Sequence, residues 1–124
     1  MIHMDSSKPI YIQIAEWIEN EIIADRFIQD SKVYSQYQLA ELFNINPATA
    51  AKGLTLLAED KILYKKRGLG MFVTPEAKAM ILDKRKNQTL TSLAEELVRE
   101  AKRLLVTEEQ LMELIRKLNR EGVE

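Results

Sequence analysis

Residues 35–73 read SQYQLAELFNINPATAAKGLTLLAEDKILYKKRGLGMFV, and this stretch carries the signals that decide the fold. Ser35 and Gln38 match a capping box, in which the serine hydroxyl accepts from the Gln38 N–H and the glutamine side chain reaches back. Asn46 is a favoured N-cap residue, and Pro47 suits the first turn of a helix, where the missing N–H costs nothing. The pattern therefore predicts two short helices joined by a tight turn, which is a helix-turn-helix unit.

A β-hairpin is predicted directly after this unit. Two β-prone runs, at residues 62–66 and 71–74, flank the glycine-bearing segment Arg67-Gly68-Leu69-Gly70. A further helix is predicted upstream, from about Pro9 to Ala24, because isoleucines and a tryptophan recur there on one helical face. A helix-turn-helix followed by a hairpin is a winged helix, and we expect this domain to span residues 1–75.

Residues 76–124 are predicted to be helical, with a kink or break at residues 87–89, because they contain no proline and no glycine before Gly122. Thr107 and Gln110 form a second capping box. Apolar residues recur at steps of three and four, which indicates a packing seam that a lone tail leaves exposed. The fold class is therefore mainly α with a small β-hairpin wing, followed by a short all-helical dimerisation tail. The residues expected in the dimer interface are Leu90, Leu93, Ala94, Leu97, Ala101, Leu104, Leu111, Leu114, Ile115 and Leu118.

Composition narrows the classes of function. The chain has 124 residues, no cysteine and one histidine, so a disulfide framework, a Cys-ligated metal and thiol catalysis are excluded. The sequence has no phosphate loop and no convincing acid pair, so we expect no enzyme activity, no metal and no cofactor. No run approaches the roughly 18 apolar residues of a membrane span, and we expect a cytoplasmic protein with no membrane partner.

Charge is distributed unevenly, although the formal net charge is only −1. Residues 31–75 hold six Lys or Arg and three Asp or Glu, a local net of +3. Residues 1–30 hold two Lys or Arg and six Asp or Glu, a local net of −4. A local excess of cations can serve DNA binding if it gathers on one face, although ordinary solvated charge gives a similar balance.

Three groups of residues are candidates for DNA contact. A recognition helix reads base edges with the side chains of its first turns. The N–H groups at a helix start can bind phosphate, and cations on a hairpin can reach the DNA backbone. Helix capping and solvated charge are the alternative roles for the same side chains. The candidates are Ser35, Gln36 and Tyr37 at the first helix start, Asn46, Ala48, Thr49 and Lys52 on the recognition helix, and Lys65, Lys66, Arg67, Gly68 and Gly70 on the wing.

The chain resembles the GntR family of transcriptional regulators, and within it the short YtrA-like branch. The motifs that carry this resemblance are Pro9-Ile10-Tyr11-Ile12-Gln13-Ile14, Ser35 to Ala40, Asn46-Pro47-Ala48-Thr49 and Arg67 to Val73. Tyr37 stands where the family usually has an arginine that grips a phosphate, so the DNA-contact set is poor in arginine. The resemblance implies a regulator that binds DNA, with contacts by Thr49, Lys52, Gly68 and Gly70.

Two interpretations of function stay open at this point. The first is a homodimeric repressor that binds a palindromic operator in double-stranded DNA through the winged helix. The second is a winged-helix module for protein–protein contact, in which the basic wing is incidental. The sequence identifies no small-molecule effector. We expect no ligand pocket within one chain, because the tail is mostly committed to helix packing and a pocket typically needs about 300–1,000 Å³; a site at the dimer interface stays open.

Overall fold

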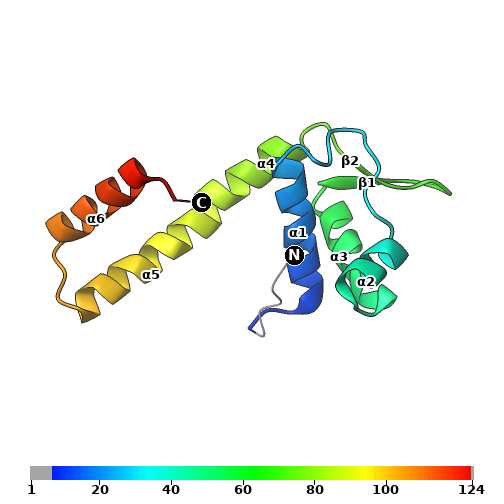
Figure 1. Ribbon diagram of the computed structural model, residues 1–124. Coiled ribbons are helices and arrows are strands. Elements are labelled where there is room, and N and C mark those ends of the chain that lie inside the picture. The colour runs from blue at the N-terminus through cyan, green and yellow to red at the C-terminus, as the bar shows by residue number, and fades with distance from the viewer. Residues whose placement is uncertain (1–6, 124) are drawn as a thin grey trace. The chain divides into compact units, whose positions relative to one another are not determined.

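A computed structural model describes residues 7–123 and divides them into two compact units, with the division after Asp83 (Figure 1). The mostly helical architecture with one antiparallel hairpin confirms the predicted fold class. The first unit contains α1 (Ile10–Ile23), α2 (Gln36–Phe43), α3 (Pro47–Glu59), β1 (Leu63–Lys66), β2 (Gly70–Val73) and most of α4 (Ala77–Lys84). The second unit contains the π-helical turn η1 (Arg85–Thr89), α5 (Leu90–Arg103) and α6 (Glu108–Glu121).

The starts of α2 and α3 follow the local sequence signals. The Gln38 N–H donates to the Ser35 hydroxyl at 3.1 Å, and the Ser35 N–H donates to Gln38 Oε1 at 2.8 Å, so the predicted capping box is confirmed. The side-chain oxygen of Asn46 accepts from the Ala48 N–H at 2.7 Å, as expected of an N-cap. Asn44 ends α2 with a φ of 54°, a left-handed conformation that asparagine tolerates better than most residues.

The three helices pack around one apolar core. Ile14 of α1, Leu39 of α2 and Leu57 of α3 are fully buried, and each such side chain stabilises the fold by roughly 1.5–3 kcal/mol relative to an exposed position. Gly53 allows α3 to approach α1 closely, because a Cβ at this position would lie 2.9 Å from the Tyr11 carbonyl oxygen. Glycine at position 53 is therefore required for the close packing of α3 against α1.

β1 and β2 form the predicted hairpin, with Leu63 paired to Val73 at the base and Lys66 paired to Gly70 near the turn. Gly68 in the turn has a φ of 78°, which glycine adopts without the clash that a Cβ would make. The hairpin is the wing of the winged helix.

A third extended segment, which the sequence pattern did not indicate, lies along the free edge of β2. The Val33 N–H donates to the Met71 carbonyl at 2.9 Å, and the Val73 N–H donates to the Ser31 carbonyl at 3.0 Å. These bonds place Lys32 beside β2, although the two are far apart in sequence.

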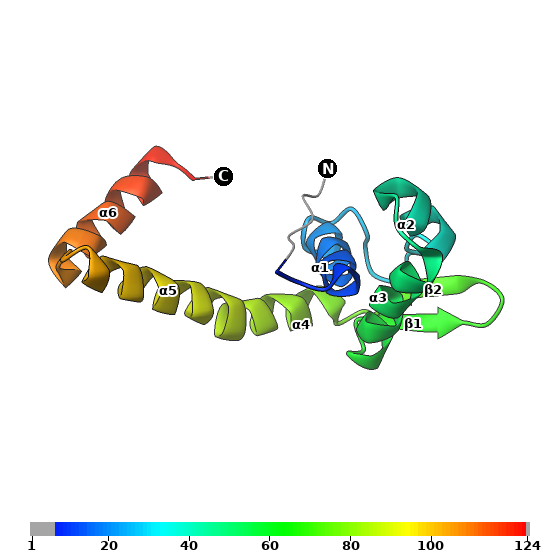
Figure 2. The ribbon, with the colours of Figure 1, turned by 90° about the horizontal axis from the view of Figure 1, so that it is seen from below.

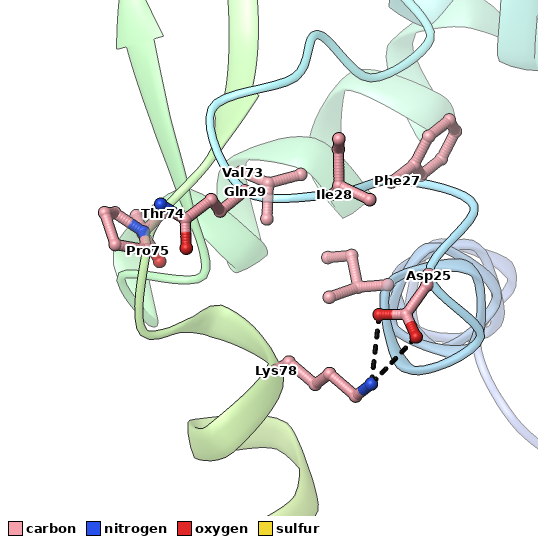
Figure 3. A pocket seen from close by; sticks show the side chains of 9 residues that line it. Asp25, Phe27, Ile28, Gln29, Val73, Thr74, Pro75 and Lys78 are labelled. Carbon is pink, nitrogen blue, oxygen red and sulfur yellow. Dashed lines mark hydrogen bonds and ion pairs between the residues drawn. The ribbon is translucent and has the colours of Figure 1, made fainter.

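The first unit includes the beginning of α4, which the sequence analysis assigned to the tail. Ala77 and Ile81 are fully buried in the core of this unit. The Lys78 ammonium lies 3.0 Å from both carboxylate oxygens of Asp25, which ties α4 to the segment after α1 (Figure 3). The compact unit therefore continues past the boundary predicted at Pro75, because the apolar side chains of α4 find their packing partners in the winged helix.

The second unit is helical, as predicted. Residues 85–89 form a π-helical turn, so no break occurs and the expected irregularity at residues 87–89 is this local departure from α-helix. The capping box at the start of α6 is confirmed, because the Gln110 N–H donates to the Thr107 hydroxyl at 3.1 Å and the Thr107 N–H donates to Gln110 Oε1 at 2.9 Å. Figures 1 and 2 show that the chain turns back between α5 and α6.

Candidate nucleic-acid interface

The start of α2, the outer side of α3 and the wing enclose one groove on the first unit, with a volume of about 540 Å³. The start of α2 and the wing, which were both predicted to touch DNA, border it, but none of the predicted α3 residues Asn46, Ala48, Thr49 and Lys52 is among its lining residues. Of the predicted contact residues, the groove is lined by Ser35, Gln36, Tyr37, Lys65 and Gly70.

At the start of α2, the candidate residues divide into a cap and an exposed aromatic side chain. The Ser35 hydroxyl accepts from the Gln38 N–H, so Ser35 fixes the helix start. Tyr37 is 69% exposed, and its phenol is free to reach a partner outside the chain. The first-turn N–H groups, including those of Gln36 and Tyr37, have no intrahelical acceptor and are available to an anion.

On α3, the predicted base-reading residues are held in different ways. Ala48 is exposed and Thr49 is half-buried in the first turn, where the Asn46 cap orients the chain. The Lys52 ammonium lies 4.1 Å from the centre of the Tyr11 ring on α1, a cation–π contact that holds the side chain against the protein. Thr55 is exposed and lines the groove, and the sequence analysis missed it because it lies one turn beyond the residues considered.

The two wing lysines point to opposite faces of the hairpin. Lys65 and its cross-strand partner Met71 both line the groove. The Lys66 ammonium lies 4.4 Å from the Phe72 ring centre and 5.8 Å from that of Tyr64, on the other face, as the alternation of a strand requires. The groove therefore receives the charge of Lys65, and Lys66 is engaged with an aromatic pair.

The tip of the wing carries the remaining candidates. Arg67 and Gly68 are exposed in the turn, and Leu69 beside them is 61% exposed. A Cβ on Gly68 would meet nothing, so the position is open to solvent and demands glycine only for its positive φ.

Lys32 is the basic residue of the groove that sequence reasoning missed. The residue borders the groove, but its stem lies over Gly70, where a Cβ would be 2.9 Å from Lys32 Cε. The Lys32 side chain therefore lies on the hairpin face of Phe72 and Lys66, opposite the face of Lys65. No local pattern joins residue 32 to the wing, because only the pairing with β2 brings them together.

A hydrogen bond anchors the wing to the segment that carries Lys32. The Tyr64 hydroxyl donates to Asp30 Oδ1 at 2.8 Å, and this bond raises the pKa of the Tyr64 phenol above its ordinary value. The Tyr64 ring also stacks on Phe72, with ring centres 5.9 Å apart. The wing is therefore held at its base by side chains as well as by backbone pairing.

The predicted interface residues of the tail lie mostly exposed on the described chain. On α5, Leu93 and Leu97 are exposed, and Ala101 near the turn is buried. On α6, Ile115 is exposed and Leu111 is half-buried. The remaining exposed members of the predicted set are Leu90, Ala94, Leu104, Leu114 and Leu118. Both helices thus carry apolar faces that the single chain does not cover.

A second, smaller hollow lies between α1, β2 and α4, with Ile22, Phe27 and Val73 among its lining residues (Figure 3). Its volume of about 240 Å³ is below the range typical of ligand pockets. Within residues 7–123, no group of three or more His, Cys, Asp or Glu could hold a metal ion. No helix in the described part of the chain has the length and apolar character to cross a membrane.

Comparison with known proteins gives relatives along nearly the whole chain, although no family model matches it. The chain is 30% identical over 117 residues to YhcF, an uncharacterized HTH-type transcriptional regulator of Bacillus subtilis (strain 168), and the match covers 94% of this chain and 95% of YhcF. A solved GntR family transcriptional regulator from Listeria monocytogenes superposes with a TM-score of 0.75 and 29% identity, covering 92% of this chain and 98% of that one. The DNA-binding domain of AraR, solved in complex with operator ORR3, superposes with a TM-score of 0.53 and 26% identity, covering 60% of this chain and 89% of that one.

Proposed function

We propose that this chain, which belongs to the GntR family of DNA-binding transcriptional regulators, acts in the cytoplasm as a homodimeric repressor on a palindromic operator. We place it in the YtrA-like branch on the strength of the Asn46-Pro47-Ala48-Thr49 motif at the start of α3. We assign DNA binding to the winged helix and dimerisation to the helical tail.

The observation that carries this proposal is the groove between α2, α3 and the wing. It brings Lys65 of the wing and the start of a capped helix to one groove of a winged helix, in a chain whose net charge is only −1. Cations on one face, rather than a high net charge, are what the sequence-independent part of DNA binding requires. A protein-docking module has no need of this arrangement of charge.

The parts of the surface have separate roles in the proposed complex. The first turns of α3 enter the major groove, where Ala48 and Thr49 meet base edges. The start of α2 and the groove-facing side of the wing contact phosphate, which sets the register of the protein on the duplex. The exposed tip of the wing, with Arg67 and Gly68, reaches the neighbouring groove or its backbone.

The exposed apolar faces of α5 and α6 support the proposed homodimer. Leu93, Leu97, Ile115 and Leu118 are each 40–56% exposed in the single chain. A contiguous apolar face of this kind marks an interaction site in a soluble protein, and a second copy supplies an identical face around a two-fold axis. Two winged helices related by that axis read two half-sites, so we expect a palindromic operator with half-sites about one helical turn apart.

In this proposal the dimer represses transcription by occupying the promoter duplex, which excludes other proteins from the same DNA.

Three measurements test the proposal: selection of bound duplexes from a random pool, sedimentation of the free protein, and an in vitro transcription assay. We expect selected sequences with dyad symmetry, a dimer in solution and reduced transcription from a promoter that contains the selected site. Selected sequences without symmetry, or binding that does not weaken with salt, would refute it.

A further inference from the structure

We propose that Leu105, in the turn between α5 and α6, is an anchor of the dimer interface that packs against the tail of a second copy of this chain. This role rests on the proposed function and adds to it a residue outside the predicted interface set. Leu105 is the most exposed large apolar side chain of the described chain, at 89%, and its backbone has a left-handed φ of 59°. Both properties are unfavourable for a leucine in an isolated chain.

Four helices of the chain end in the same way, which allows Leu105 to be compared with its equivalents. In each, an N–H just past the helix donates to the carbonyl five residues back, and the residue before this donor is left-handed. The donors are Arg26, Ile45, Ile62 and Val106, with N···O distances of 2.8–3.0 Å. The left-handed residues are Asp25 after α1, Asn44 after α2, Lys61 after α3 and Leu105 after α5.

The leucine is the only apolar residue among these four left-handed positions. A left-handed backbone brings Cβ close to the following carbonyl, a clash that glycine lacks and that asparagine and aspartate tolerate better than a bulky side chain does. At the three equivalent positions the exposed side chain is polar, whereas Leu105 presents its apolar side chain to water. A side chain this exposed gains little from burial within the described chain. The leucine therefore indicates contact with another molecule.

The charges around Leu105 favour a second copy over DNA or a membrane surface. Two cations in the last turn of α5 and two anions in the first turn of α6 flank it, namely Lys102, Arg103, Glu108 and Glu109. DNA and an anionic membrane attract surfaces that carry cations in excess. An apolar residue between charges of both signs is instead complementary to an identical surface after a two-fold rotation.

Leu105 is also continuous with the apolar faces assigned to the dimer. Leu104 beside it is exposed, and the turn joins α5 and α6, which carry those faces (Figure 1). A symmetric dimer that covers the faces of both helices can extend over this turn, and it would then bury Leu105 twice.

The experiment measures dimerisation and stability for the full-length wild type, Leu105→Asn, Leu105→Met and Lys61→Asn. Asparagine suits the left-handed backbone and removes the apolar side chain, whereas methionine keeps the position apolar. Lys61→Asn makes the same backbone change at the equivalent end of α3, in the first unit. Sedimentation equilibrium gives Kd, and urea unfolding at several protein concentrations separates the stability of the monomer from that of the dimer.

We expect Leu105→Asn to raise Kd by at least about a hundredfold, because a largely exposed leucine is buried in both copies. The same variant should leave the monomer at least as stable as the wild type, since it relieves the left-handed leucine. Leu105→Met should retain most of the affinity of the dimer, and Lys61→Asn should leave Kd unchanged. A monomer that gains stability while its dimer loses affinity is the result that a purely structural role of Leu105 would not give.

A wild-type Kd for Leu105→Asn would show that Leu105 is outside the interface and would refute the inference, with the dimer itself intact. If Leu105→Asn destabilises the monomer and leaves Kd unchanged, Leu105 packs within its own chain, and the inference is equally wrong. An increase of Kd in Lys61→Asn as large as that in Leu105→Asn would also overturn it, because the loss would then not depend on the leucine. If the wild type sediments as a monomer at every concentration, the homodimer of the proposed function fails, and the inference fails with it.

Discussion

Leu97 offers the sharpest test of the proposed dimer. It lies on the apolar face of α5 and is 40% exposed in the single chain. Full burial of a leucine stabilises by roughly 1.5–3 kcal/mol, so covering the exposed two fifths contributes about 0.6–1.2 kcal/mol per chain. A two-fold axis places this residue in the interface twice. Leu97→Ala should therefore weaken the dimer by about 1.2–2.4 kcal/mol, roughly eightfold to sixtyfold in Kd.

Leu97→Asp adds a larger penalty, because association would then desolvate two carboxylates without a partner, at a cost of several kcal/mol. We expect this variant to sediment as a monomer at micromolar concentration, where the wild type is a dimer. Ser92→Asp is the matched control, since it introduces the same group on the opposite side of α5, where Ser92 is exposed. It should leave the dimer intact.

The measurement is sedimentation equilibrium over a range of concentrations, with far-UV circular dichroism to show that both variants stay helical. Leu97 is outside the buried core of the described chain, so a folded monomer is the expected product. If Leu97→Asp dimerises with the Kd of the wild type, the α5 face is not the interface, and the assignment of dimerisation to the tail is wrong.

Three further outcomes follow from the first unit. Lys65→Met should weaken DNA binding and flatten its salt dependence more than Lys66→Met does, because the Lys66 ammonium lies over Phe72 on the other face of the wing. Equal losses of affinity in the two variants would contradict the assigned faces. Gly53→Ala should destabilise the winged helix by about 1 kcal/mol or more in urea unfolding, because overpacking against α1 costs about 1–3 kcal/mol and the higher helix propensity of alanine returns at most about 1 kcal/mol. A stabilised variant would show that α1 shifts to admit the methyl group. Ile81→Ala should cost about 2–5 kcal/mol in the same assay, against little for the exposed Met80→Ala, and an unaffected stability would place α4 outside the winged-helix core.

Much of the fold could be predicted from the sequence because its determinants are local. Each capping box pairs residues three positions apart, so the serine at 35 and the threonine at 107 mark helix starts without reference to the rest of the chain. The hairpin follows from two β-prone runs around two glycines, both of which have a positive φ. The order of these elements is sufficient to indicate a winged helix. It also identifies the start of α2 and the wing, which border the groove, as candidate contact segments.

The tertiary structure alone determines which distant segments of the chain are neighbours. Lys32 reaches the wing only through pairing with β2, and Gly70 beside it has a φ of 119°, which favours glycine. Strand alternation separates Lys65 from Lys66, but only the packing of the hairpin decides which of them faces the groove. Ile81 follows a proline that reads as a domain end, yet it is buried in the first unit. Caps and turns depend on neighbours within a few residues, whereas faces, boundaries and grooves depend on contacts between segments that are distant in sequence, and no local pattern specifies those.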